Sequence, residues 1–169
     1  MSSQVVLNFM RQQGFAEEPA DACNMHFVGL YFQPRIMFAL VLVATLLQSG
    51  PLFLVLAAVL WWNTLVPRLN PFEFVYNRLL APRRGAVPLL PAPGPRRFAQ
   101  GMAAAFQTAA GLLLILGQPI VAAVFEVGLV AAFSMLMFGR FCLGAYIFHV
   151  LRGEVRFANS TLPWAGAKP

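Results

Sequence analysis

The chain has 169 residues, of which 59% are hydrophobic and 11% charged, and its mean hydropathy is +0.69. This composition excludes an ordinary soluble domain and is typical of an integral membrane protein. The net charge of +6 does not indicate a nucleic-acid-binding protein. Its arginines gather between the second and third apolar segments, as in a cytoplasmic loop. We therefore expect the protein to contact the lipid bilayer and no nucleic acid.

Residues 1–33 are a polar or amphipathic beginning of the chain. Residues 2–13 place apolar and polar side chains at helical spacing, which predicts either a short helix on the membrane surface or a frayed polar terminus. Cys23 and His26 of this segment are side chains that could bind a metal ion. They could form a four-ligand site with Cys142 and His149 only if this segment folded under the bundle. We therefore predict no metal site and no cofactor.

The first transmembrane hairpin is expected over residues 34–80. Its first apolar stretch, 36–47, has only about 12 residues, too few to span the bilayer. The helix begins either near Phe27 or at Pro34, and we favour Pro34 as its first residue, with Arg35 reaching the cytoplasmic headgroups. A second helix returns to Val66 and is followed by an amphipathic helix on the inner surface.

The remaining chain divides into three parts. Residues 81–95 are rich in proline and arginine and predict a stiff cytoplasmic linker without a helix. Residues 96–151 form a second transmembrane hairpin, whose apolar helices have about 19 residues each, enough to cross most of the hydrocarbon layer. Residues 152–169 are a polar cytoplasmic tail.

The two hairpins have similar outlines, and laying Asn70 on Cys142 aligns the amphipathic segments that follow them. Both would begin and end in the cytoplasm, which is a parallel repeat about an axis along the membrane normal. The sequence thus predicts an all-α, integral membrane four-helix bundle built from two parallel helical-hairpin repeats. Amphipathic helices would lie at the interface, and both termini would be cytoplasmic.

Small residues recur every four positions in the second hairpin. They are Gly101, Ala105 and Ala109 in the third span and Gly128 and Ala132 in the fourth. Small side chains at this spacing let two helix backbones approach closely in lipid. The pattern fits packing of these two helices on each other and, as an alternative, the seam of a dimer.

We single out two polar side chains inside the second hairpin, Glu126 and Gln107. Glu126 would lie roughly 10 Å below the outer turn, a depth at which a carboxyl group is costly. It either bonds polar neighbours such as Gln48 and holds the helices in register, or serves a proton or ion relay, or contacts another subunit. A single acid is a poor transport pathway by itself.

Basic residues mark the cytoplasmic face. We assign to it Arg35, Arg68, Arg83, Arg84, Arg96, Arg97 and Arg140. Arg140 is about 30 Å along its helix from the outer turn, so that snorkelling or contact with lipid phosphate accounts for it.

The segments GPRRFAQG at 94–101 and RFCLG at 140–144 resemble a family of small bacterial four-helix membrane proteins known only as a domain of unknown function. The resemblance covers roughly residues 33–151 and implies a place in the bacterial inner membrane. In that family a CPF-type motif closes the first half and FCLGC ends the second. Here Asn70 and Ala145 stand where the family has cysteines, which leaves Cys142 without the resolving thiol that thiol exchange needs.

We therefore expect a non-catalytic accessory or scaffold subunit that packs on itself or on other membrane subunits, in a respiratory or photosynthetic complex. One alternative is a thiol or sulfur redox protein acting through Cys142. The other is a small transporter or pore that uses Glu126. No catalytic residue is predicted outside the Cys142 alternative.

Overall fold

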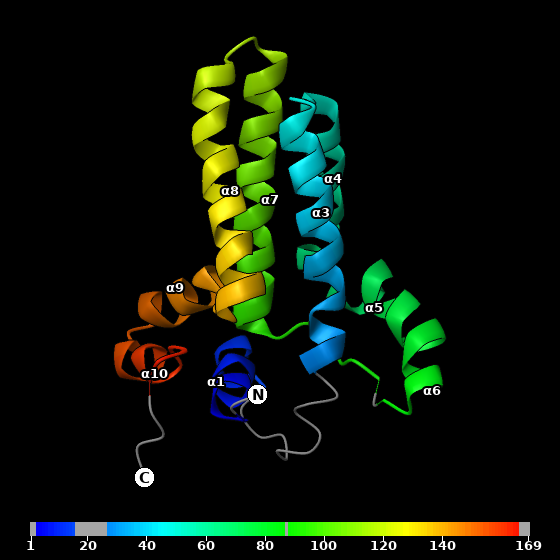
Figure 1. Cartoon of the computed structure of the whole chain (residues 1–169), viewed down its shortest axis with the longest axis vertical. Coiled ribbons are helices and arrows are strands. Elements are labelled where there is room, and N and C mark those ends of the chain that lie inside the picture. The colour runs from blue at the N-terminus through cyan, green and yellow to red at the C-terminus, as the bar shows by residue number, and fades with distance from the viewer. Residues whose placement is uncertain (1–2, 16–26, 87, 166–169) are drawn as a thin grey trace.

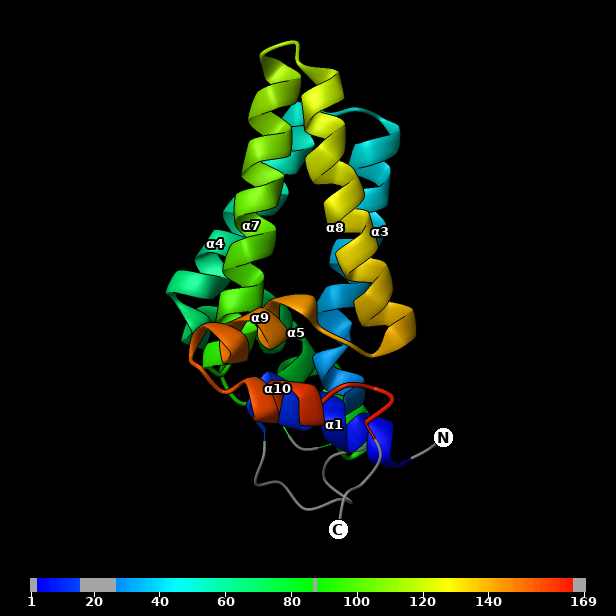
Figure 2. The same cartoon turned by 90° about the vertical axis from the view of Figure 1, so that its left-hand side faces the viewer.

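Four helices run side by side along the long axis of the molecule, and shorter helices lie across one end of them (Figures 1 and 2). The structure is a computed structural model that describes residues 3–15, 27–86 and 88–165. The long helices are α3 (Phe32–Leu46), α4 (Gly50–Leu65), α7 (Gly94–Ile115) and α8 (Pro119–Gly139). α3 and α7 each contact both α4 and α8, so the four helices form a closed ring.

Within the described residues, three helical stretches are long and apolar enough to cross a membrane: Phe27–Leu46, Gly94–Ile115 and Pro119–Gly139. The fourth, Gly50–Leu65, is equally apolar but shorter, with 16 residues or about 24 Å. Large hydrophobic side chains point outward from α8; Ile120 is 86% and Phe138 81% exposed. Exposed apolar surface on helices of this length is typical of contact with lipid. The prediction of an all-α membrane protein is confirmed at this level.

The first span begins earlier than Pro34, where we expected it. A helical turn starts at Phe27, and α3 follows from Phe32, so that Pro34 is the third residue of α3. Proline is tolerated there because the backbone N–H groups of a first helical turn need no partner within the helix. The whole stretch from Phe27 has 20 residues, which removes the difficulty of a span that is too short.

The segment between the two hairpins is more helical than we predicted. α5 (Pro71–Val75) begins at Asn70, whose side-chain oxygen accepts hydrogen bonds from the first free backbone N–H groups. A π-helical turn over Tyr76–Leu80 leads into α6 (Ala81–Arg84). The expectation that residues 81–95 contain no helix is therefore wrong for α6, where proline occupies the first turn and is tolerated for the reason given above.

Three more short helices lie at the end of the bundle where α5 and α6 are found, and they come from the N-terminal and C-terminal parts of the chain. They are α1 (Ser3–Gln13), α9 (Leu143–Leu151) and α10 (Val155–Ser160), and together with α5 and α6 they form the base of the molecule (Figure 1). α8 ends at Gly139, and Arg140, with φ of +51°, turns the chain so that α9 runs across the bundle (Figure 2). The tail after residue 151 thus contains a helix and is part of the base.

α1 neither frays nor lies free on a membrane surface. Its apolar residues Val6, Phe9 and Met10 are buried, and so are its polar residues Asn8 and Gln12. Asn8 donates to the backbone oxygens of Leu162 and Ala165, at 3.1 and 3.2 Å. The polar face of α1 is therefore satisfied by the C-terminal segment instead of by water or lipid headgroups.

The small residues of α7 pack mainly on α4. Gly101 lies against Thr64 of α4, and Ala105 is exposed. The closest approach of the two backbones is at Gly111, where an added Cβ would lie 2.9 Å from the backbone oxygen of Gly50. Gly128 of α8 does meet α7, at the ring of Phe106. The contact at Gly111 is one that the four-residue spacing did not indicate.

Candidate ligand-binding site

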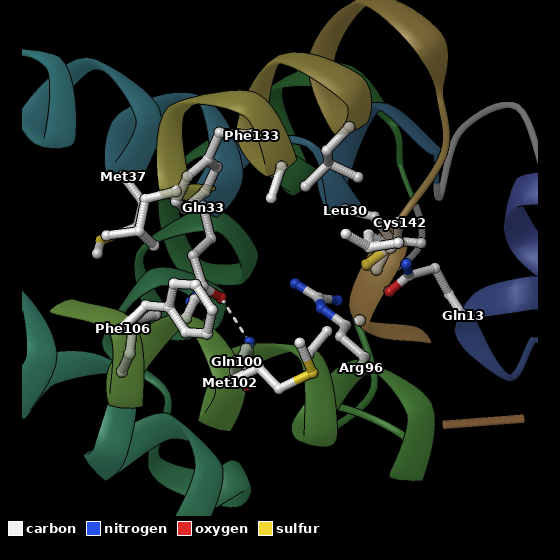
Figure 3. A pocket seen from close by; sticks show the side chains of 18 of the residues that line it. Gln13, Leu30, Gln33, Met37, Arg96, Gln100, Met102, Phe106, Phe133 and Cys142 are labelled. Carbon is white, nitrogen blue, oxygen red and sulfur yellow. Dashed lines mark hydrogen bonds between the residues drawn. The ribbon is translucent and has the colours of Figure 1, made fainter. Parts of the chain in front are cut away.

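A cavity of about 240 Å³ lies in the half of the bundle next to the base; we call it the basal cavity (Figure 3). Its walls come from α3, α7 and α8 and from Leu60 of α4, and its floor from α1 and the beginning of α9. Apolar side chains make most of its lining, among them Met37, Met102, Phe106, Leu129 and Phe133. Polar side chains are confined to one region, next to the base: Gln13, Gln33, Arg96, Gln100 and Cys142.

The cavity opens between α7 and α8. Its lining residues on α3 are buried, with Gln33 4% and Met37 1% exposed. On α7 and α8 the lining residues Met102, Phe106 and Ala132 remain partly exposed. The exposed part of the lining therefore faces the surroundings of two candidate membrane spans, which is the side from which a molecule dissolved in lipid would enter.

Arg96 brings a positive charge to the polar end of this cavity. It is the third residue of α7, only 5% exposed, and its guanidinium group points into the cavity (Figure 3). Its Nη2 lies 3.7 Å from Oε1 of Glu73 on α5, too far for a hydrogen bond. Its Nη1 is buried and has no hydrogen-bond partner among the described residues. Arg96 thus keeps donor capacity for something that enters the cavity.

A chain of amides holds the surroundings of Arg96 in place. Gln33 Oε1 accepts from Gln100 Nε2 at 3.1 Å and from Asn70 Nδ2 at 3.2 Å. Asn70 Oδ1 in turn accepts from the backbone N–H of Phe72 at the beginning of α5. The amide chain thereby fixes α5, and with it Glu73, against α3 and α7. Burial raises the pKa of Glu73, although the guanidinium of Arg96 and the amide of Asn70 act to lower it.

Cys142 lies in the cavity wall at the beginning of α9. Its backbone N–H donates to Gln12 Oε1 of α1 at 2.9 Å. Burial raises the pKa of its thiol, and the backbone N–H of Ala145 and the Gln13 amide, which lower it, do not offset this effect. The thiol is therefore protonated at neutral pH, and a protonated thiol is a poor nucleophile.

His149 of α9 holds α1 against the base beside the cavity floor. Its Nε2 lies 3.2 Å from the backbone oxygen of Gln12, and its Nδ1 lies 2.7 Å from Oε2 of Glu154. The hydrogen bond with His149 is the main reason why the pKa of Glu154 is lowered. A carboxyl group whose pKa is lowered on folding stabilises the folded protein at pH values above its ordinary pKa of 4.5. This stabilisation is lost as the pH falls through the pKa of the folded state.

We therefore expect Glu154→Gln to lower the melting temperature at pH 7 and to have progressively less effect as the pH is lowered below 4.5. Thermal unfolding of the two proteins in the same detergent between pH 7 and pH 3.5 measures this difference. Glu73 is present in both proteins, so its effect on the pH dependence of the melting temperature cancels in the comparison. A difference that stayed constant with pH would contradict the assignment of the His149 contact.

A second polar contact lies between the basal cavity and the outer turns. Glu126 is only 2% exposed, and its Oε2 accepts from Gln48 Nε2 at 2.8 Å. Gln107 of α7 is fully buried, and neither of its amide atoms has a partner among the described residues. None of the three lines the basal cavity. The geometry therefore shows a tie between the α3–α4 turn and α8.

Gln48 adopts φ of +47°, a conformation that costs a residue with a side chain about 1 kcal/mol. We expect Gln48→Ala to lower the free energy of unfolding, because it keeps this strain and loses the bond to Glu126. Gln48→Gly loses the same bond and relieves the strain, so it should be more stable than the alanine variant by about 1 kcal/mol. Thermal unfolding of the three proteins measures the difference, and equal stability of the alanine and glycine variants would contradict it.

The arginines assigned to the cytoplasmic face separate into two groups. Arg35, Arg68, Arg83 and Arg97 are exposed, Arg140 is half-buried over the ring of Phe27, and Arg96 alone of the described six is buried. The side chain of Arg84 and residues Cys23 and His26 lie outside the described part of the structure. Within that part, no three side chains of His, Cys, Asp or Glu are placed to hold a metal ion.

Sequence reasoning did not find the polar side chains that gather around Arg96. Glu73, Gln33 and Gln100 come from three different helices, and only the fold brings them together. A signal was present in Gln33 and Gln100, since each is an amide at the end of an apolar span. Neither could be told from a residue at the lipid interface.

A comparison with protein families matches residues 28–152 to a domain of unknown function, DUF4395. No curated protein and no solved structure gives a significant match to the chain. The match includes all four long helices and every described residue that lines the basal cavity on α3, α4, α7, α8 and α9. The chain therefore belongs to the DUF4395 family.

Proposed function

We propose that this protein is a non-catalytic membrane protein that binds a small amphiphilic molecule in the basal cavity. The observation that carries the proposal is the cavity itself: it is mostly apolar, has polar groups at one end, and opens between two helices that meet lipid. Binding sites for small molecules have this composition, an apolar lining with a few polar groups that fix orientation. An amphiphile fits this cavity with its apolar part against the apolar lining and its polar head at the polar end.

The proposal places the basal cavity at the cytoplasmic end of a bundle in the bacterial inner membrane. The segment that joins α4 to α7 contains Arg68 and Arg83 and leads to Arg97 in the first turn of α7, at the end where the base lies (Figure 1). Arginine-rich connections stay in the cytoplasm. α1 and α10 lie at the same end, which supports cytoplasmic termini. Asn70 and Cys142 both precede the helix that follows a hairpin, in extended conformation, which supports the hairpin-repeat hypothesis.

We keep the accessory-subunit hypothesis in a narrower form, in which the protein holds its ligand for a larger membrane assembly or for a second copy of itself. Extraction in a gentle detergent followed by mass measurement tests this part. Stoichiometric companion subunits, or a defined homo-oligomer, are the expected results. A monomer without companions would remove the accessory role and leave ligand binding in place.

The thiol alternative is less well supported by the geometry. A redox role through Cys142 requires a reactive thiolate and a second sulfur, whereas burial raises the pKa of this thiol. The position of the family's second cysteine holds Ala145, which is fully buried. Full retention of ligand binding in Cys142→Ser would agree with a wall residue that takes no part in chemistry.

The transport alternative is also less well supported. Glu126 is engaged by Gln48 and is buried, and the groups near it form a tie between helices. Transport of a proton or ion needs a series of polar stations. The lining of the basal cavity between Phe106 and the base offers polar groups only at its inner end.

The proposal is tested with a substitution that fills the cavity by a larger side chain and leaves the charge of the protein unchanged. Ala132 lines the cavity from α8, and its neighbour Ala131 is exposed and does not. Equilibrium dialysis of labelled octanoate and labelled 1-octanol against the protein in nanodiscs, with empty nanodiscs as blank, measures binding. We expect the unmodified protein and Ala131→Leu to bind at least one probe, and Ala132→Leu to lose most of it. If the unmodified protein bound neither octanoate nor 1-octanol, the proposal would be overturned.

A further inference from the structure

Three buried polar atoms at this end of the basal cavity have no hydrogen-bond partner among the described residues: the donor Arg96 Nη1 and the acceptors Glu73 Oε1 and Gln100 Oε1. Of the three, only Arg96 Nη1 is a donor and belongs to a positively charged group, and the nearest acid among the described residues, Glu73, is 3.7 Å from the other nitrogen of the guanidinium. A buried charged group that lacks hydrogen bonds is costly, and an acceptor that carries negative charge removes the cost best. Water satisfies the donor but not the charge.

We propose that the ligand of the basal cavity is a monoanionic single-chain amphiphile, a carboxylate on a short acyl chain, whose head is bound by Arg96. This inference rests on the proposed function and adds the chemical class of the ligand. One guanidinium group, already partly compensated by Glu73, matches one negative charge better than two. The carboxylate accepts from Nη1 while its chain lies along the apolar lining.

The size of the cavity limits the chain. A cavity of about 150 Å³ holds benzene, so a cavity of 240 Å³ holds a molecule of roughly ten non-hydrogen atoms. Octanoate has this size, whereas a diacyl phospholipid does not fit. From Arg96 to Phe106 the wall of α7 is ten residues, or about 15 Å, long, which is longer than an extended octanoate, so that the whole chain lies along the apolar lining.

The direction of entry agrees with this ligand. The opening lies between α7 and α8 on the side of lipid, while Arg96 is the third residue of α7 and thus lies at the level where headgroups are expected. A fatty acid in the inner leaflet has its carboxylate at the same level. It would enter sideways with its head already near the guanidinium group.

The neighbouring arginines provide a matched pair for the experiment. Arg96 is buried in the cavity, and Arg97 is exposed and bonds the backbone oxygen of Thr64 outside it. In nanodiscs of zwitterionic lipid we expect octanoate to bind more tightly than 1-octanol. Arg96→Gln should weaken octanoate binding about tenfold or more and leave 1-octanol binding unchanged, because only the anion loses a charged donor. Arg97→Gln should change neither.

Two further measurements do not depend on the Arg96 variant being folded. Glu73→Gln removes the competing negative charge and should tighten octanoate binding while leaving 1-octanol binding unchanged. In the otherwise unmodified chain with Cys23→Ser, octanoate should slow alkylation of Cys142 by a membrane-permeant maleimide, because Cys142 lines the same cavity.

The outcomes separate the two proposals. Equal affinity for octanoate and 1-octanol, or equal weakening by Arg96→Gln and Arg97→Gln, would overturn the anion inference and leave the binding function in place. Octanoate binding that is unaffected by Glu73→Gln and gives no protection of Cys142 would place the anion outside the cavity and also overturn the inference. Binding of neither probe would overturn the proposed function itself.

Discussion

Replacing Gln12 by leucine is expected to release α1 from the base and to open the floor of the basal cavity. Gln12 is fully buried, and its Oε1 accepts from the backbone N–H of Cys142 at 2.9 Å. Leucine has similar bulk but leaves that N–H without a partner, which costs about 2 kcal/mol. If this cost lowers the free energy needed to detach α1 from the base, the fraction of molecules with α1 detached rises about 30-fold.

Hydrogen exchange of α1 amides and the rate of Cys142 alkylation both report this opening. The control is Gln4→Leu, since Gln4 is a glutamine of the same helix whose hydrogen bond goes to Asn8, within α1. We expect the control to exchange and react like the unmodified protein. Equal rates in all three proteins would show that α1 is held by its apolar contacts alone, namely those of Val6, Phe9 and Met10.

Replacing Gly111 by alanine should have the second large effect, on the stability of the whole bundle. An added Cβ would lie 2.9 Å from both the backbone oxygen of Gly50 and a side-chain carbon of Leu54. A backbone atom cannot move aside without displacing a helix, so α4 and α7 must separate. Overpacking of this kind costs typically 1–3 kcal/mol. Thermal unfolding in detergent measures the loss.

Gly139→Ala is the matched control for this change. Gly139 is also a helical glycine, at the end of α8, and nothing lies within 4 Å of its added Cβ. Alanine is the better helix former, so the control should be as stable as the unmodified protein or slightly more so. If both alanine variants were equally stable, the backbones at Gly50 and Gly111 would not be in contact in the membrane.

The membrane class and the spans follow from local composition, which is why they could be predicted. Hydropathy summed over some 20 residues depends on nothing outside the segment. The beginning of the first span was missed because a proline and an arginine interrupt the apolar run at 34 and 35. Pro34 lies in the first turn of α3, directly after the turn at Tyr31, and Arg35 is exposed, so that neither residue ends the helical stretch. The pattern alone did not distinguish this case.

The sequence by itself determined that this chain is helical, that it belongs in a bilayer, and that its arginines gather at one end. Only the tertiary structure decided which arginine lies in the basal cavity. Arg96 and Arg97 are adjacent, yet one enters the basal cavity and the other faces outward, because successive residues on a helix point about 100° apart. The rotation of α7 about its axis is set by contacts with α4, α8 and α9, and contacts between such distant segments are not written in local sequence.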